Sequence, residues 1–140
     1  MIELSDIQRQ LVLAMLSQAA LTFVVLLMLP VPRIMALRAG KVTRDAAGHP
    51  IFPKWATQVA DCFNNQFQVP VLFYVIVILT LWLHVESDQT VWLAWAFVAL
   101  RVAHAAVFVT TNFVPVRFLL FLVSSVLVLQ MGLQVVGPVL

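Results

Sequence analysis

The sequence predicts an all-α integral membrane protein that crosses the bilayer as a four-helix bundle. Of its 140 residues, 63% are hydrophobic and only 10% are charged, and the mean hydropathy is +1.03. A soluble domain of this size would need far more polar surface. Four apolar runs each approach the ~20 residues that a helix needs to cross a bilayer. The hydrocarbon core offers the backbone no water, so each run is expected to be helical.

The first two helices are expected at about residues 8–31 and 57–84. The first follows from the run "LVLAMLSQAALTFVVLLMLPV". It comes after "MIELSDIQRQ", which lacks the basic segment of a cleaved signal peptide, so the helix is expected to stay in the membrane. The second combines the run "VPVLFYVIVILTLWL" with the segment before it, "QVADCFNNQFQ", because the run alone is too short to span.

The third and fourth helices are expected at about residues 90–110 and 116–138. They follow from the runs "VWLAWAFVALRVAHAAVFV" and "FLLFLVSSVLVLQMGLQVVGPVL". No second domain fits beside four such helices, so residues 1–140 are expected to form a single transmembrane domain. None of the four runs shows an obvious discontinuity in mid-membrane, which disfavours a channel or transporter.

The connections between the helices predict the orientation. The long first connection is basic and carries Arg33, Arg38, Lys41, Arg44 and Lys54. The positive-inside rule places it in the cytoplasm. The third connection, "TTNFVPVR", then lies on the same side. Both termini and the acidic connection "HVESDQT" are expected on the non-cytoplasmic side.

A polar stripe is predicted where the second helix begins. The side chains Asp61, Asn64, Asn65 and Gln68 are spaced i, i+3, i+4 and i+7, which puts them on one helix face. Polar residues elsewhere in the membrane are expected to have a structural role, as interhelical hydrogen-bonding groups: Gln18, Ser124, Ser125, Gln130 and Gln134.

Arg101 and His104 form a second polar pair, on one face of the third helix. An unpaired arginine inside an apolar run costs at least ~2.5–3.5 kcal/mol on insertion scales. Arg101 is therefore expected to turn inward and to bind the carboxylate of Asp61 or several amide oxygens of the stripe.

Two interpretations of these polar residues stay open. In one, they make interhelical hydrogen bonds worth roughly 0.6–2 kcal/mol each. In the other, they form a pocket that opens toward the basic connection, where Arg38, Lys41 and Arg117 surround an anionic ligand near Asn65 and Gln68. No phosphate loop, serine-nucleophile elbow, metal-ligand cluster or zinc spacing is visible, and neither a metal nor a nucleic-acid partner is expected.

These motifs, in this order, resemble the MAPEG family, the membrane-associated proteins of eicosanoid and glutathione metabolism. The segment "NNQFQVPVLFY" looks most like the bacterial branch, and "RVAHAAVFVTTNFVPVR" is similar to microsomal glutathione transferase. The resemblance covers essentially the whole chain. It implies a homotrimer with active sites between subunits, a bacterial inner-membrane location, bound glutathione, and a lipophilic acceptor that arrives from the bilayer.

The resemblance also assigns candidate site residues. A catalytic role falls on Arg117, beside the sulfur, and cofactor binding falls on Arg38, Asn65, Gln68, Arg101 and His104. Nearby positive charge favours the thiolate that must attack.

Three positions depart from the family pattern. Gln68 stands where a Glu is usual, Phe108 where many members have a Tyr, and Asp61 where the eukaryotic enzymes have an Arg. Two functions therefore remain open: a glutathione-dependent transferase or peroxidase acting on lipophilic electrophiles, and a non-catalytic membrane scaffold or accessory subunit of a larger complex.

Overall fold

The structure is a computed structural model that describes residues 4–137. Its elements, in chain order, are α1 (Asp6–Met28), α2 (Pro30–Arg38), β1 (Thr43–Arg44), β2 (Pro50–Ile51), α3 (Lys54–Asn65), α4 (Val69–Trp82), α5 (Asp88–Val109) and α6 (Val114–Val136).

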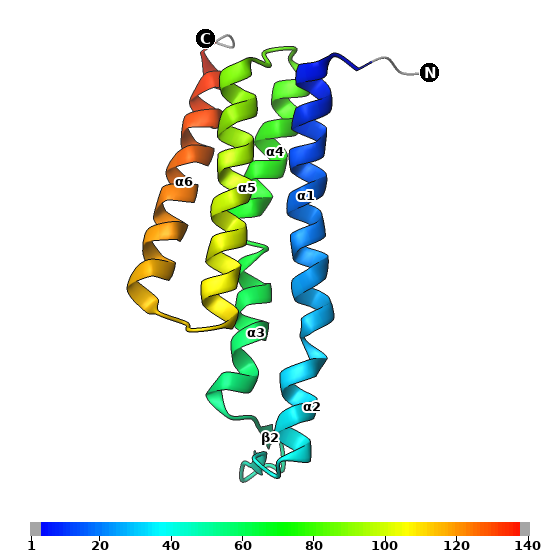
Figure 1. Ribbon diagram of the computed structural model, residues 1–140, viewed down its shortest axis with the longest axis vertical. Coiled ribbons are helices and arrows are strands. Elements are labelled where there is room, and N and C mark those ends of the chain that lie inside the picture. Colours follow the sequence, from blue (N-terminus) through cyan, green and yellow to red (C-terminus); the bar gives the residue numbers. More distant parts are fainter. Residues whose placement is uncertain (1–3, 138–140) are drawn as a thin grey trace.

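Four helical segments are long and apolar enough to cross a membrane, so the predicted all-α membrane bundle is confirmed. They lie side by side: α1 with α2, α3 with α4, then α5 and α6 (Figure 1). The α4–α5 connection lies at the end where α1 begins and α6 ends. The α5–α6 connection and the β-hairpin lie toward the other end, which we call the basic end.

The first crossing is longer than the prediction. The helix begins at Asp6 because Ser5 caps it: the Ser5 hydroxyl accepts from the backbone N–H of Gln8, and the Gln8 side chain accepts in return. At the other end, helical structure continues as α2 to Arg38, seven residues past the predicted limit. The prolines of α2 fall in its first turn, where a missing N–H removes no hydrogen bond. The predicted end of the fourth helix, residue 138, lies outside the described residues.

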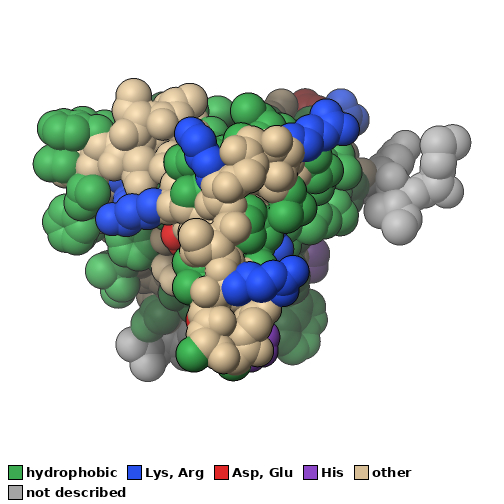
Figure 2. Space-filling view, turned by 90° about the horizontal axis from the view of Figure 1, so that it is seen from below, with side chains coloured by type: hydrophobic (Ala, Val, Ile, Leu, Met, Phe, Trp, Pro, Cys, Tyr) green, Lys and Arg blue, Asp and Glu red, His purple; other side chains and the backbone are tan. Residues whose placement is uncertain are grey.

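A short hairpin closes the protruding part of the chain at the basic end. β1 and β2 pair antiparallel, and the Asp45 carboxylate accepts from the backbone N–H groups of His49 at 2.8 Å and Ala47 at 2.9 Å. These hydrogen bonds hold the pKa of the Asp45 carboxyl below its usual value, and the bond from the His49 backbone contributes most. Seen from below, Lys and Arg side chains project around this end, between apolar ones (Figure 2).

The main core lies in the half of the bundle away from the basic end. Phe73 of α4 stacks on Phe97 of α5, with ring centroids 4.4 Å apart, and both side chains are fully buried. Leu11 of α1 and Met131 of α6 belong to the same buried cluster. All four crossings therefore contribute side chains to this core, and the aromatic pair joins α4 to α5.

The second crossing is broken, and the prediction of a continuous helix over 57–84 is wrong. α3 ends at Asn65 and α4 starts at Val69, with Gln68 in an irregular conformation between them (φ −98°, ψ −106°). Pro70 explains the break: in a continuous helix its ring would clash with the carbonyl of Gln66, four residues earlier, and it has no N–H to donate. The sequence showed no obvious discontinuity in any of the four runs, but the structure has one in the second crossing.

Side chains from two other helices bind the groups at the break. Arg101 of α5 donates from Nη2 to the backbone oxygen of Asn65 at 3.1 Å and to its Oδ1 at 3.2 Å. A cation at the last carbonyls of a helix also complements the negative end of its dipole. Gln18 of α1 donates to Oε1 of Gln66 at 3.1 Å, and the Gln66 amide reaches back to the carbonyl of Cys62.

We expect Gln66→Leu to lower the free energy of unfolding by about 1–3 kcal/mol, because it leaves the buried Gln18 amide without a partner. Adding Gln18→Leu should recover most of that loss, since two apolar side chains then face each other. The exposed Gln130→Leu serves as the matched control. Thermal unfolding in a mild detergent measures five proteins: the native protein, the single variants Gln66→Leu and Gln18→Leu, the double variant and the control. A double variant that is as unstable as the sum of the two single ones contradicts this account.

Candidate functional site

A pocket of about 200 Å³ lies at the basic end, beside the break in the second crossing. The residues around it are Asn65, Gln68, His104, Val114, Arg117, Phe118 and Phe121. Four of the six site residues expected from the sequence are among them. The break, the last turns of α5 and the first turns of α6 thus bring together residues that lie far apart in the chain.

Arg117 is half-buried in the first turn of α6. Its Nη1 donates to Oδ1 of Asn112 at 2.6 Å, and its guanidinium carbon lies 4.1 Å above the centre of the Phe108 ring. Asn112 adopts a left-handed conformation (φ 49°) that reverses the chain between α5 and α6. The loop and the ring therefore hold the cation by a hydrogen bond and a cation–π contact. The Phe108 ring therefore helps to orient Arg117.

His104 lines the pocket, and one of its ring nitrogens has no hydrogen-bond partner in the described part of the chain. Its ring is only 2% exposed, and Nδ1 lies 3.0 Å from the backbone oxygen of Arg117. A carbonyl oxygen can only accept, so Nδ1 carries the proton and donates it. In the neutral ring, Nε2 then holds a free lone pair, and it has no hydrogen-bond partner within residues 4–137. A ligand that brings an N–H or S–H group here would satisfy it.

Asn65 connects the pocket to the helix break. Its Oδ1 accepts from Arg101, and its Nδ2 donates to Oε1 of Gln68 at 3.4 Å, a long hydrogen bond. Gln68 is exposed, so its amide is free to turn toward a ligand. Asn65 therefore binds Arg101 at the helix break and also lines the pocket.

Arg101 turns inward, as expected, but not to the expected partner. It binds oxygens of Asn65 within one chain, whereas Asp61 is exposed and makes no ion pair in the part of the chain that the structure describes. The expected contact across a subunit boundary is thus made inside the subunit. Arg101 is fully buried and does not line the pocket, and its Nε and Nη1 have no partner among the described residues.

Arg38 lies apart from the pocket of its own chain. It is exposed at the end of α2, in the protruding segment. Sequence reasoning also missed residues that shape the pocket, notably Asn112, Phe118 and Phe121. The first is part of an ordinary loop sequence, and the two aromatic residues belong to a uniformly apolar run that gives no sign of a pocket.

The pocket offers one cation, one imidazole acceptor and two amides inside an apolar wall. Such a set suits a ligand that carries a carboxylate or thiolate together with N–H groups. It does not suit a metal ion, and no three His, Cys, Asp or Glu side chains lie together as ligands in residues 4–137.

The family model of the MAPEG family matches residues 11–137. No curated protein and no solved structure matches the chain. The matched residues include nearly all of the four crossings, the break at residues 66–68 and every residue of the pocket. The chain is therefore an integral membrane protein that belongs to the MAPEG family.

Proposed function

We propose that this protein is a glutathione-dependent transferase or peroxidase that acts on lipophilic electrophiles. One observation carries the proposal: in a MAPEG chain, the side chains of Arg117 and His104 line one pocket at the basic end of the bundle. Glutathione carries carboxylates, an ammonium, amide N–H groups and a thiol. Arg117 supplies the positive charge that favours the thiolate, and Nε2 of His104 accepts from a ligand donor.

His104 compensates in part for the carboxylate that is missing at position 68. A glutamate at position 68 would pair with the glutathione ammonium, and the neutral amide does so less strongly. The imidazole nitrogen adds a second neutral acceptor. Asn65, held by Arg101, orients the peptide beside them.

The size of the pocket supports a homotrimer with shared sites. About 200 Å³ is below the ~300–1,000 Å³ of sites that enclose a drug-sized ligand. In the proposed homotrimer, one chain supplies one wall of the site and a neighbouring subunit supplies the other. The exposed Arg38, remote from its own pocket, is our candidate for a cation donated to the neighbour's site. The similarity to the bacterial branch supports a bacterial inner-membrane location.

Glutathione titration by calorimetry, with a conjugation assay on a general electrophile, tests the activity. Arg117→Gln should lower kcat by about 100-fold, because the variant loses a charge that stabilises the developing thiolate. Arg33→Gln, an exposed arginine away from the pocket, should retain activity. A native protein that neither binds glutathione nor conjugates it would contradict the proposal.

Gln68→Glu should tighten glutathione binding by about tenfold, because a carboxylate pairs with the ammonium better than an amide does. Gln130→Glu, on an exposed position of α6 away from the pocket, is the control and should leave the dissociation constant unchanged. Unchanged or weaker binding of glutathione to the Gln68 variant would show that the pocket does not hold the ammonium there.

The assembly can be tested without any activity. In mild detergent, the mass of the protein particle measured by light scattering should be three times that of the chain. A clean monomer would contradict the shared-site arrangement.

A non-catalytic scaffold is the second candidate, and the departures at Gln68, Phe108 and Asp61 favour it. In that case Arg117→Gln leaves the cellular function intact, whereas substitutions on the lipid-facing helix surfaces abolish it. The opposite pattern excludes the scaffold.

A further inference from the structure

Asp61 of α3 is an exposed carboxylate that makes no ion pair among residues 4–137. The segment from α2 to α3 contains one other carboxylate, that of Asp45, which accepts hydrogen bonds from backbone groups of its own hairpin. In the described part of the chain, Asp61 is therefore the carboxylate near the helix break that remains available to a ligand.

The place of Asp61 follows from the contacts of two residues on the same face of α3. Gln58, three residues earlier, donates to the backbone oxygen of Phe108, and Asn65, four residues later, lines the polar pocket. Residues three and four apart share a helix face. Asp61 therefore lies between the end of α5 and the pocket. Arg117 lies against the Phe108 ring, so a carboxylate of α3 and a guanidinium of α6 are both close to the pocket.

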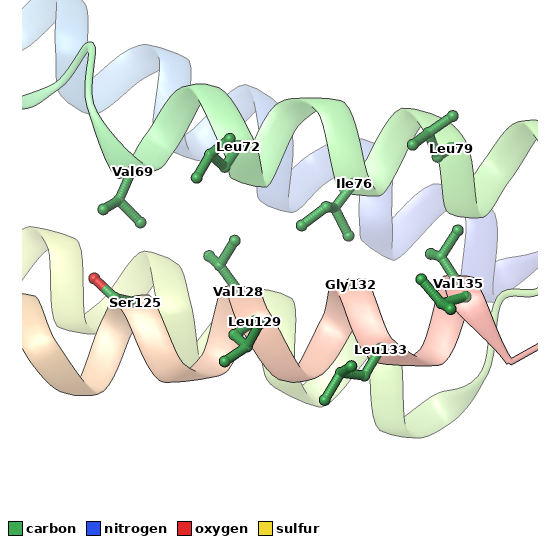
Figure 3. A pocket seen from close by; sticks show the side chains of 11 residues that line it. Val69, Leu72, Ile76, Leu79, Ser125, Val128, Leu129, Gly132, Leu133 and Val135 are labelled. Carbon is green, nitrogen blue, oxygen red and sulfur yellow. The ribbon is translucent and has the colours of Figure 1, made fainter.

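An apolar groove between α4 and α6 adjoins the pocket on the side away from the basic end (Figure 3). It begins on α4 at Val69, the residue after Gln68 of the pocket. Of the described residues on its walls, only Ser125 has a polar side chain, and its hydroxyl already donates to the carbonyl of Phe121 at 2.8 Å. A charged group would lose its water there without gaining a partner, which is costly. The charged parts of a ligand that exceed the pocket therefore extend the other way, toward Asp61.

The pocket itself has no negative charge for the ligand proposed above. Glutathione brings an ammonium, whereas the described residues that line the pocket include a guanidinium, an imidazole and two amides but no carboxylate. An ammonium binds a carboxylate more strongly than a neutral acceptor. Asp61 lies one turn from Asn65, about 6 Å along the helix at 1.5 Å per residue. It is the one carboxylate of α3 (Lys54–Asn65), so an ammonium bound beside Asn65 has no nearer negative charge on this helix.

We infer that Asp61 binds the ammonium of glutathione and makes the site select thiol peptides that have a free α-amino group. The inference rests on the proposed glutathione-dependent activity and names the residue that recognises this end of the peptide. Arg117 of α6 interacts with the thiolate, while Asp61 of α3 binds the opposite charge. The partner of the ammonium is thus displaced by about two helical turns, from position 68, where Gln68 carries no charge, to position 61.

Two thiol peptides test the inference by calorimetry on the full-length protein in mild detergent. One is glutathione, and the other is glutaryl-cysteinylglycine, which has a hydrogen atom in place of the ammonium. Asp61→Asn should raise the glutathione dissociation constant by about fivefold, the effect of a strong solvent-exposed ion pair. The analogue should bind this variant no more weakly than it binds the native protein. Added salt should reduce the native preference for glutathione over the analogue, because salt screens exposed charges.

Two further variants serve as controls. Asp61→Glu keeps the charge and should retain most of the preference for glutathione. Asp88→Asn makes the same chemical change at an exposed position where α5 begins, away from the pocket, and should leave both dissociation constants unchanged. In a conjugation assay, Asp61→Asn should raise the KM for glutathione and leave kcat unchanged, because the ammonium takes no part in the reaction at the sulfur.

The outcomes separate this inference from the proposed function. If the native protein binds neither peptide, both fail. If the native protein binds and conjugates glutathione but Asp61→Asn weakens both peptides equally, the carboxylate has a structural role or pairs with a cation of a neighbouring subunit, and only the inference fails. A native protein that binds the two peptides equally well also overturns the inference alone.

Discussion

The absence of water from the bilayer core is the constraint on which this structure depends. A membrane helix that breaks must satisfy its freed backbone groups with protein atoms. Here Arg101 donates to the last carbonyl of α3 and to the side chain of the same residue, Asn65. The buried cation and the broken helix stabilise each other: each supplies a partner that hydrocarbon cannot.

The pocket follows from that arrangement. The break fixes Asn65 and Gln68 at the level where α5 ends and α6 begins, so they meet His104 and Arg117. The two arginines have different roles. Arg101 is fully enclosed and supports the backbone, whereas Arg117 lies at the edge of the pocket, held by the Phe108 ring and Asn112. Arg101 therefore supports the broken helix, and Arg117 is the arginine that lines the pocket.

Hydropathy alone predicted the four crossings, because a run of about 20 apolar residues has few alternatives to a spanning helix. Insertion energetics also predicted correctly that Arg101 turns inward. The partner was harder to foresee: Asp61 has the better charge, but the break places the Asn65 oxygens within reach instead. Pro70 was visible in the sequence, yet proline is tolerated in membrane helices, so its presence alone did not predict a break.

The break also divides the second crossing into two helices, α3 and α4, which are held by different contacts. α3 is tied by polar bonds to α1 and α5, whereas α4 has only 14 residues and contacts its neighbours mainly through apolar side chains. Apolar contacts have no fixed direction, so sliding along them breaks no hydrogen bond. A displacement of α4 along its neighbours would therefore leave intact the hydrogen bonds at the break, which Gln18 and Arg101 make.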